Sequence, residues 1–445
     1  MPIRRLFGSL PAFAVDPNQF HVLPSALGFR EYVLNAIRNA TSRIYLVALY
    51  LEDDEAGREI LTAAYEAKQR NPRLDVAICV DWHRAQRGLI GAKNGTGNAA
   101  MYQAFADKFP HPIPVYGVPV RNREVFGVLH LKGCVIDDSV IYSGASFNNV
   151  YLHFHDRYRF DRYHVIQHTA LANSIAEFIQ YDLIDHPAVQ DLSHRLLPTT
   201  KALKPAIRQF RLALGKATYR VDNQPVSEGQ VAVTPLVGVG RRGNDLNQTI
   251  ITMLVQAVDE LVLCTPYFNL PKVVLREIKR AIKRGVKVSI VVGDKKANDF
   301  YIAPDQPFKA ISGLPYLYEM NLRKFAAVNE RHIASGQLSI HLWKHGGNSF
   351  HLKGLWVDRR IMLLTGNNVN PRAWALDLEN GLLINDPKQH LLAKFSEEFD
   401  TIYQHTQRID SLSQFEVMDD YPAKVQRLLK KVIRTRADRL LKRIL

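Results

Sequence analysis

Long apolar runs are absent from this chain, and cysteine is scarce in it. No stretch of roughly 18 or more uncharged apolar residues occurs, so the sequence predicts no membrane-spanning helix. The three cysteines, Cys79, Cys134 and Cys264, are an odd number, and each lies in an apolar, strand-like run. A disulfide framework is therefore not expected, and the composition favours a reducing compartment, the cytoplasm.

The N-terminus also lacks the uninterrupted apolar segment of a secretory signal. Arg4 and Arg5 precede an apolar stretch, and residues 12–14 (Ala-Phe-Ala) resemble a cleavage pattern. Gly, Ser and Pro within residues 8–11 interrupt that stretch, however. We therefore expect a chain that is not secreted.

Acidic side chains are in deficit. There are 43 Asp and Glu residues against 58 Lys and Arg residues, which gives a net charge of +15. This charge favours a polyanionic partner, either nucleic acid or an anionic membrane surface. Neither an aromatic-interleaved basic surface nor a helix-turn-helix pattern stands out, so we expect no specific nucleic acid partner. A nuclease or a non-catalytic nucleic-acid binder is the alternative from a different class of function.

Much of the positive charge lies in residues 424–445, which contain nine Lys or Arg residues and one Asp. Apolar residues recur there at helical spacing, which predicts an amphipathic helix with a cationic face. One interpretation is a helix in the interface of an anionic membrane, which would attach the protein peripherally to the inner face of the cytoplasmic membrane. The other is a C-terminal helix packed on the protein with a solvated basic face. The residues expected to contact lipid are Lys424, Arg427, Lys430, Lys431, Arg434, Arg439, Lys442 and Arg443.

Two blocks of the chain repeat the order strand, helix, strand. The segments are 43–52, 58–71 and 74–85 in the first block and 260–269, 271–285 and 286–299 in the second. Each block ends in an Asp at the tip of its second strand, Asp81 or Asp294. Strands joined by helical crossovers predict an α/β fold, with a mixed, largely parallel sheet flanked by helices in each half.

The pattern H-x-K-x(4)-D follows each block, at residues 130–137 and again at 351–358, each time with Leu after the His and Gly after the Lys. Because side chains alternate between the faces of a strand, His130 and Lys132 are expected to project together, and so are His351 and Lys353. Two halves related by a pseudo-twofold axis would bring both couples into one pocket.

Two imidazole and two ammonium groups that face each other suit the chemistry of a phosphodiester or a pyrophosphate. One His attacks phosphorus and the other protonates the leaving oxygen, while the lysines neutralise charge on the phosphoryl oxygens. No metal or other cofactor is expected, because the Lys beside each His would repel a cation. The alternative to a catalytic site is that both histidines are structural residues in the core, on duplicated strands.

The last residue of each motif, Asp137 or Asp358, has the opposite strand parity to the His and the Lys. It lies where the strand ends, so it is better suited to fixing a turn or a neighbouring strand than to contacting substrate. Both residues stay in the predicted catalytic set, with this interpretation attached.

Polar residues after the two motifs are candidates for supporting functions. Asn148 and Asn370, each preceded by a nearby Gly (Gly144 and Gly366), can donate to phosphoryl oxygens. Asp161 and Glu379 are the carboxylates expected to hold the second ring nitrogen of a His. Four arginines are candidates either for holding anionic groups or for plain salt bridges: Arg157, Arg159, Arg162 and Arg372.

On these residues the chain resembles the phospholipase D superfamily, whose members carry the duplicated H-x-K-x(4)-D with a downstream Gly and Asn. The segments VALYLEDDEAG, LCTPYFNLP and TGNNVNPRAWALDLEN, with the basic tail, look more closely similar to bacterial members that act on CDP-diacylglycerol and L-serine. The resemblance implies transfer of a phosphatidyl group to serine through a phosphatidyl-histidine, with release of CMP. The resemblance to relatives that carry two motifs also assigns His130 as the nucleophile and His351 as the general acid and base. A phospholipase D or a cardiolipin-synthase-like phosphatidyltransferase with another acceptor is the alternative.

The same resemblance divides the chain into three parts. We expect one phospholipase D-like lobe in residues 1–205, a second lobe in residues 206–415, related to the first by pseudo-twofold symmetry, and the basic membrane-binding tail in residues 416–445. The Pro-containing, basic segment 191–211 would connect the lobes.

Overall fold

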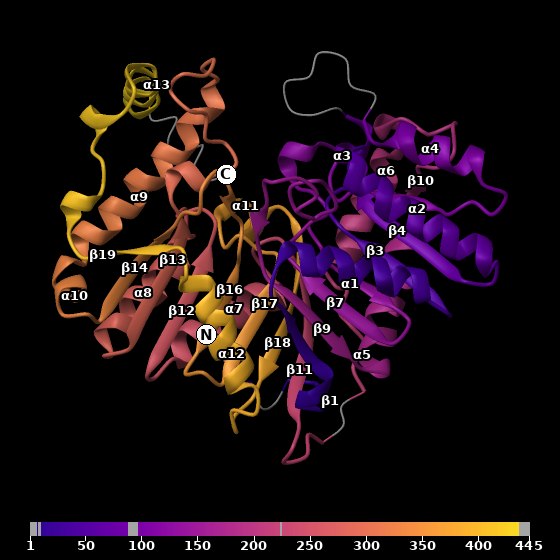
Figure 1. Cartoon of the computed structure of the whole chain (residues 1–445), viewed down its shortest axis with the longest axis horizontal. Coiled ribbons are helices and arrows are strands. Elements are labelled where there is room, and N and C mark those ends of the chain that lie inside the picture. Colours follow the sequence, from indigo (N-terminus) through magenta and orange to yellow (C-terminus); the bar gives the residue numbers. More distant parts are fainter. Residues whose placement is uncertain (1–6, 8–9, 88–96, 223–224, 436–445) are drawn as a thin grey trace.

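The structure is a computed structural model that describes residues 7, 10–87, 97–222 and 225–435. It contains two large sheets that lie side by side, one in each half of the chain, with helices covering them (Figure 1). Of the N-terminal signal-like pattern, residues 1–6, 8 and 9 lie outside the described residues, whereas Phe13 and Ala14 form part of a strand.

The sheet of the N-terminal half has eight strands. In spatial order they are β10 (Gln190–Asp191), β5 (Val115–Val118), β4 (Asp75–Asp81), β3 (Arg43–Val47), β6 (Gly133–Ile136), β7 (Ser139–Ser143), β9 (Tyr163–Gln167) and β2 (Phe20–Leu23).

The sheet of the C-terminal half has nine strands. Their order is β19 (Thr406–Ile409), β14 (Leu338–Trp343), β13 (Lys287–Gly293), β12 (Glu260–Thr265), β16 (Gly354–Val357), β17 (Ile361–Thr365), β18 (Leu378–Asn385), β11 (Val231–Val239) and β1 (Phe13–Val15). Apart from β1, each strand has a counterpart at the same place in the first sheet. The predicted duplication is therefore confirmed at the level of topology.

The prediction of largely parallel sheets is wrong, although the mixed α/β class is confirmed. Within the two large sheets, parallel pairing is confined to β3–β4–β5 and β12–β13–β14, which are the strands joined by helical crossovers. From the H-x-K motif onward the strands pair antiparallel, as β6 does with β7 and β16 with β17. Tight hairpins connect these strands, and a tight hairpin can join only antiparallel neighbours.

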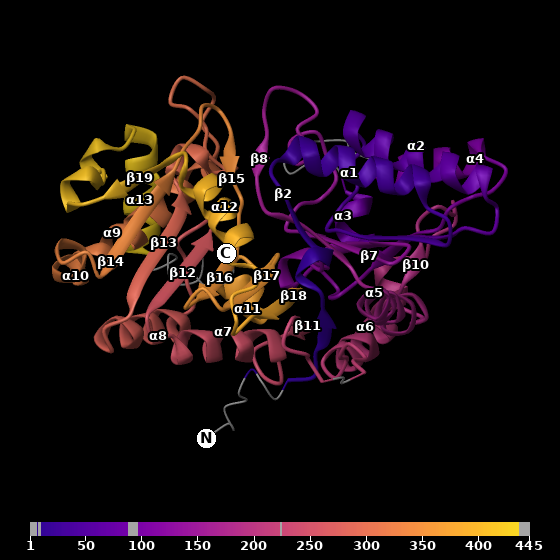
Figure 2. The same ribbon diagram turned by 60° about the horizontal axis from the view of Figure 1, so that its bottom comes forward.

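Helices cover both faces of the sheets. The described α-helices are α1 (Ala26–Asn39), α2 (Glu55–Arg70), α3 (Trp82–Gln86), α4 (Ala99–Lys108), α5 (Thr169–Glu177), α6 (Thr200–Leu214), α7 (Asp245–Gln256), α8 (Lys272–Lys283), α9 (Leu314–Val328), α10 (Glu330–Ala334), α11 (Pro371–Ala375), α12 (Leu392–Tyr403) and α13 (Ala423–Arg434). Figure 2 shows α1 and α2 on one face of the first sheet and α5 and α6 on the other. No helix in this described set has the length and apolar character needed to cross a bilayer.

The crossover helix α2 illustrates how the sequence specifies these elements. Asp54 caps the helix by accepting a hydrogen bond from the backbone N–H of Gly57 at 2.9 Å, which starts α2 at Glu55, before the predicted residue 58. Ile60, Leu61 and other apolar residues recur at helical spacing along α2, and their side chains are buried on the face of the helix that lies against the first sheet.

The two halves share an interface with both backbone and side-chain contacts. Strand β8 (Arg159–Phe160) pairs in parallel with β15 (Ser349–Phe350), so the halves form a small common sheet. Beside it, Arg162 donates to both carboxylate oxygens of Glu398, each at 2.7 Å. One hydrophobic core runs through both halves, so they fold against each other as one body.

Helix α6 and strand β1 can be compared with the predicted division of the chain at residue 205. Helix α6 runs through that residue, and β1, from the start of the chain, pairs with β11 in the C-terminal sheet. The first residues of the chain thus contribute a strand to the second half, which the sequence division assigned to the first.

Candidate active site

The two H-x-K segments occupy equivalent positions in the two sheets. His130 and Lys132 lie immediately before β6, and His351 and Lys353 immediately before β16, so the strands begin one residue after each Lys rather than including the motif. All four side chains belong to buried residues, between 1% and 8% exposed.

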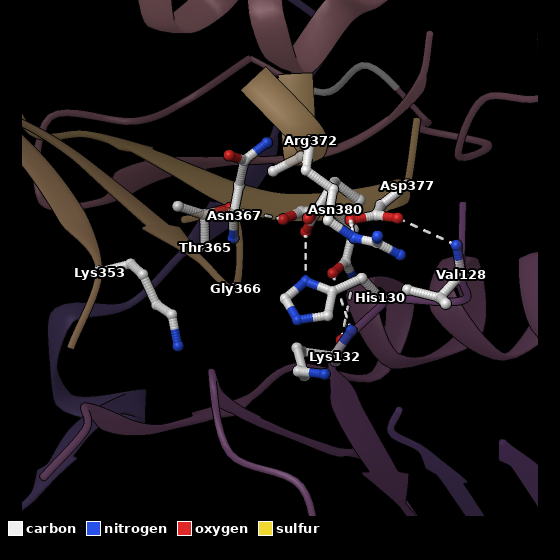
Figure 3. Close-up of polar contacts among 12 residues, drawn as sticks. Val128, His130, Lys132, Lys353, Thr365, Gly366, Asn367, Arg372, Asp377 and Asn380 are labelled. Atoms are coloured by element: carbon white, nitrogen blue, oxygen red, sulfur yellow. Dashed lines mark hydrogen bonds and ion pairs between the residues drawn. The ribbon is translucent and has the colours of Figure 1, made fainter. Parts of the chain in front are cut away.

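Backbone hydrogen bonds anchor each segment to the opposite half. The N–H of His130 donates to the carbonyl of Leu378 at 2.9 Å, and the N–H of His351 donates to the carbonyl of Phe160 at 2.8 Å. Figure 3 shows Lys132 below the His130 ring and Lys353, from the other half, to the left of it. Lys353 and His351, both from the second motif, lie near enough to His130 to contribute to the lowering of its pKa. The structure therefore brings the two couples together in one site.

The carboxylates that hold the histidines cross between the halves. His130 Nδ1 lies 2.9 Å from Glu379 Oε2, although Glu379 belongs to the C-terminal half. His351 Nδ1 lies 2.9 Å from Asp161 Oδ2, although Asp161 belongs to the N-terminal half. The predicted carboxylate–histidine contacts are present. Because each carboxylate comes from the half opposite to its His, the position of each ring depends on both halves. A carboxylate on Nδ1 leaves Nε2 as the ring nitrogen for chemistry.

The surroundings of the two rings differ. His351 is also contacted by Lys353 and by the Tyr151 hydroxyl, which lies 3.1 Å from both ring nitrogens. His130 Nε2 has no hydrogen-bond partner among the described residues, and its ring contacts only Glu379 in this way. The site is thus asymmetric despite the duplication.

Burial and neighbouring ammonium groups keep both imidazoles neutral. The pKa of His130 lies well below its ordinary value because the ring is buried and lies near Lys132 and Lys353. Burial and Lys353 likewise lower the pKa of His351. A neutral imidazole can attack phosphorus or accept a proton, which a protonated ring cannot.

The two lysines differ in how they are paired. Lys353 Nζ lies 3.4 Å from Asp161 Oδ2, whereas the buried Lys132 Nζ has no hydrogen-bond partner in the described part of the chain. Burial lowers the pKa of Lys132 to about 7 and that of Lys353 to about 8. An unpaired buried ammonium is costly, and an anionic ligand would satisfy it.

Close packing around the site explains the two glycines noted in the sequence. A Cβ at Gly366 would lie 2.7 Å from Lys132 Cγ, and a Cβ at Gly144 would lie 2.7 Å from Asp161 Oδ2. Each Gly therefore makes room for a side chain of the site, as expected for a close backbone approach.

The structure gives the two predicted asparagines local capping contacts. Asn148 Oδ1 accepts from the N–H of Tyr151 at 3.0 Å. Asn370 Oδ1 accepts from the N–H of Ala373 at 2.8 Å and caps α11. These contacts position Tyr151 and α11, and donation from either amide to phosphate stays a prediction.

The motif aspartates bind backbone rather than the histidines. Asp137 accepts from the N–H groups of Thr41, Ser42 and Arg43 at 2.9, 2.8 and 3.1 Å, just before and at the start of β3. Asp358 accepts from the N–H groups of residues 258–260 before and at the start of β12, at 2.8 to 3.1 Å. The parity argument is therefore favoured over a contact with substrate.

Replacing Asp137 or Asp358 by Ala is expected to lower the free energy of unfolding by about 1–3 kcal/mol, with little change in kcat of the folded enzyme. Burial raises the pKa of Asp137, but hydrogen bonds from the Ser42 hydroxyl and from the three backbone N–H groups outweigh it and lower the pKa to about 2. A lowered pKa means that this stabilisation is present above about pH 4, the unfolded value, and is lost as the pH falls toward 2. Denaturant unfolding and initial rates measure the two effects; a 100-fold loss of kcat at unchanged stability would contradict this assignment.

Several residues of the site were missed by sequence reasoning. Asn380 accepts from the N–H of Lys132 and donates to its carbonyl, both at 2.9 Å, and so fixes the backbone of the motif. Tyr142 donates to the Asn380 carbonyl at 3.1 Å. Asp81 accepts from the N–H of Leu129 at 2.9 Å while capping α3. The only sequence signal was position: Asn380 directly follows Glu379, and Asp81 ends the repeated block.

The candidate arginines mostly have structural partners. Arg162 pairs with Glu398 across the interface, and Arg372 lies 3.1 Å from Asp377. Arg159 lies 2.8 Å from Asp299, close to His351. Arg157 forms no hydrogen bond or ion pair with another described residue and is exposed.

Helix α13 is the described helix of the basic tail, and its buried apolar residues are turned to the protein, whereas Ile433 is exposed. Val425 and Leu429 are buried in a small cluster with Tyr316, Leu317 and Tyr421. The exposed basic residues of α13 are Lys424, Arg427, Lys430, Lys431 and Arg434. For this segment the structure follows the second interpretation, a packed helix with a basic face. Arg439, Lys442 and Arg443 lie outside the described residues.

Among the described residues, no group of three or more His, Cys, Asp and Glu side chains is placed to hold a metal ion. The three cysteines are free and buried, as the sequence predicts. The absence of a metal requirement stays a prediction.

Known proteins are similar to this chain over nearly its whole length. Residues 250–403 match the family model "Cardiolipin synthase, PLD-like domain". A CDP-diacylglycerol–serine O-phosphatidyltransferase of Haemophilus influenzae is 49% identical over 441 residues, covering 98% of this chain and 97% of the relative. One of Escherichia coli is 47% identical over 433 residues, covering 97% and 95%.

A solved structure is similar over the same extent. The crystal structure of phosphatidylserine synthase from Haemophilus influenzae matches with a TM-score of 0.95 at 48% identity, covering 98% of each chain.

Proposed function

The chain belongs to the CDP-diacylglycerol–serine O-phosphatidyltransferase family of the phospholipase D superfamily, and we propose that it makes phosphatidylserine by two displacements at one phosphorus atom. The substrates are CDP-diacylglycerol and L-serine, and the products are phosphatidylserine and CMP. The observation that carries the two-step mechanism is the crossed pair of carboxylate–histidine contacts, which aligns one imidazole from each half on a common site.

In the first displacement, Nε2 of His130 attacks the phosphorus that bears the diacylglycerol. The Nε2–P bond forms, the P–O bond to CMP breaks, and CMP leaves with the electron pair. Glu379 holds Nδ1 and stabilises the positive charge that develops on the ring. The unengaged Nε2 of His130, compared with the crowded ring of His351, supports this assignment of nucleophile.

In the second displacement, the hydroxyl oxygen of serine attacks the phosphatidyl-histidine. The O–P bond forms, the Nε2–P bond breaks, and His351 takes up the hydroxyl proton. Asp161 supports the resulting imidazolium. The lysines contribute charge in both steps: the unpartnered Lys132 ammonium is suited to a phosphoryl oxygen.

The proposal is tested with purified protein, CDP-diacylglycerol in detergent micelles, and labelled acceptors in the presence of a chelator. We expect CMP release coupled to phosphatidylserine formation, with serine preferred over water and glycerol, and no loss on chelation. Equal or better transfer to water or to another alcohol would replace the proposed function by a phospholipase D or a related phosphatidyltransferase. Inactivation by the chelator would contradict the metal-free mechanism.

We place the enzyme at an anionic membrane surface, the inner face of the cytoplasmic membrane, because its lipid substrate resides in a bilayer. The exposed basic face of α13 supports this, since each Lys or Arg near anionic lipid adds roughly 1 kcal/mol of attraction. Because Val425 and Leu429 are buried in the protein, charge rather than apolar insertion is the contribution expected from α13.

Changing the five exposed basic residues of α13 to Gln is expected to weaken binding to anionic vesicles by on the order of 1000-fold at low salt. Activity in detergent micelles should persist, because the buried residues of α13 are untouched. Vesicle co-sedimentation and micelle assays measure the two.

Helix α8 offers a matched control, because it carries the same number of exposed basic residues. They are Lys272, Arg276, Lys279, Arg280 and Lys283. Their change to Gln removes the same net charge, so an equal loss of binding would show that α13 has no special part. Unchanged binding of the α13 variant would defeat the proposal outright.

A further inference from the structure

A buried ion pair beside His351 has no part in the two displacements. Arg159, in β8, and Asp299, which follows the 3-10 helix η5 (Lys295–Ala297), come from different halves. Arg159 Nη2 lies 2.8 Å from Asp299 Oδ1, and the side chains are only 15% and 14% exposed. Burial of such a pair is unfavourable unless the remaining donors and acceptors are also satisfied.

Hydrogen bonds to this pair are few. Within the described residues, the Arg159 guanidinium donates one long hydrogen bond, from Nε to Ser349 Oγ at 3.4 Å, out of its five N–H groups. Asp299 Oδ2 accepts from the Tyr267 hydroxyl at 3.0 Å, Oδ1 is paired with Arg159 Nη2 at 2.8 Å, and the Ser349 side chain also acts on this carboxylate as a hydrogen-bond partner. The Arg159 guanidinium therefore retains N–H groups that a ligand could use, and Asp299 is the carboxylate beside them.

Arg162 shows what a purely structural arginine looks like in the same segment. Its guanidinium donates to both oxygens of Glu398 at 2.7 Å and to the carbonyl of Leu363 at 3.3 Å, and it lies 4.0 Å from the Trp356 ring centre. Arg162 is saturated, and Arg159 is not. The difference indicates that Arg159 serves more than the interface.

The pair is also placed within reach of the reacting groups. The Arg159 guanidinium lies 4.4 Å from the centre of the Tyr151 ring, and the Tyr151 hydroxyl lies 3.1 Å from both nitrogens of His351. Both charges of the pair act on His351. A small molecule held by the pair would present a hydroxyl to the imidazole that accepts the proton in the second displacement.

We propose that Arg159 and Asp299 bind the amino-acid part of the acceptor, Arg159 the carboxylate of serine and Asp299 its ammonium group. This inference rests on the proposed function and adds the source of its acceptor preference. The carboxylate and the ammonium group of serine are attached to the same carbon atom. Serine can therefore lie antiparallel to the ion pair, with its carboxylate against Arg159 and its ammonium group against Asp299. Its binding leaves the net charge of the site unchanged. An acceptor with one charge leaves a buried group unpaired, and such a site rejects it strongly.

The first test uses the wild-type enzyme and two truncated acceptors. Ethanolamine lacks the carboxylate of serine, and 3-hydroxypropionate lacks its ammonium group. We expect kcat/KM for each to fall at least about 1000-fold below that for serine. Comparable use of either acceptor would overturn the inference without touching the proposed function, whereas no transfer to serine at all would overturn both.

The second test uses the neutral variants Arg159→Gln and Asp299→Asn. Arg159→Gln should reduce the preference for serine over ethanolamine, and Asp299→Asn the preference for serine over 3-hydroxypropionate, each by about 100-fold. Exchange of labelled CMP into CDP-diacylglycerol, which needs no acceptor, should stay near the wild-type rate. Each single variant leaves one buried charge without its partner and can therefore fold poorly, whereas the double variant removes both charges. The double variant should lose the preference for serine over ethanolamine and the preference for serine over 3-hydroxypropionate.

Two outcomes would contradict the site. Unchanged acceptor preferences in a folded double variant would reduce the pair to an interface contact. A parallel loss of CMP exchange and serine transfer would mean that the pair only positions His351. Thermal unfolding of each variant identifies those that are folded.

Discussion

His130→Ala is expected to abolish CMP release and phosphatidylserine formation together, whereas His351→Ala is expected to release one CMP per chain and then stop. Loss of a nucleophile commonly lowers kcat by more than about 10⁴-fold. The two displacements differ in their need for proton transfer. CMP leaves as a phosphate monoester, whose second pKa is only about 6, so its departure needs little help from an acid. The serine hydroxyl is far less acidic and needs a base, which His351 supplies.

The measurement is a single turnover with serine present, in which CMP and phosphatidylserine are followed separately. A matched control is His341→Ala, which removes an imidazole from β14 where it packs on Tyr403 outside the site. His341→Ala should retain activity. A CMP burst in His130→Ala and none in His351→Ala would reverse the assigned functions, and a burst in both variants would remove the need for a covalent step.

Lys132→Met is expected to lower kcat/KM for CDP-diacylglycerol by about 1000-fold while leaving the protein as stable or more stable. The ammonium group of Lys132 is buried and unpartnered in the described chain, so its removal takes away a costly unpaired charge. Its removal also takes away the cation proposed to bind a phosphoryl oxygen. Loss of activity with no loss of stability separates a binding function from a structural one.

The pH dependence gives an independent signature of the same group. Burial lowers the pKa of Lys132 to about 7, so the free enzyme holds the cation below that pH and loses it above. In wild type, kcat/KM should fall about tenfold per unit above pH 7 and more steeply above 8, where Lys353 also titrates. With Met at position 132 the first decline should disappear. Its persistence in Lys132→Met, or activity that rises with pH, would contradict the assignment.

The duplication and the reacting residues could be predicted from the sequence because they are encoded locally. A strand–helix–strand block followed by H-x-K specifies its own fold in each half, and both predictions are matched by β3–α2–β4 and β12–α8–β13. The parity of Asp137 within its strand likewise predicted a backbone contact rather than a substrate contact. Local periodicity was sufficient for these features.

The crossing of the carboxylates could not be predicted, because sequence proximity says nothing about which half supplies a partner. Glu379 contacts His130 and Asp161 contacts His351, each across the interface. Asn380 and Tyr151 were missed for the same reason, since their contacts with Lys132 and His351 form only when the halves meet. The overestimate of parallel pairing has another cause. The sequence prediction was based on the strand–helix–strand blocks, whose helical crossovers join parallel strands, whereas short hairpins connect antiparallel strands after each motif.

The most direct test of the mechanism is to count and locate the covalent intermediate. Wild-type protein is mixed with excess labelled CDP-diacylglycerol without serine, quenched in alkaline denaturant, digested and mapped by mass spectrometry. If both His–Lys couples serve one phosphorus, one phosphatidyl group per chain should be found, on the peptide that contains His130, and serine added before quenching should remove it as phosphatidylserine. Two labels per chain, a label on His351, or a full CMP burst without any label would contradict the account.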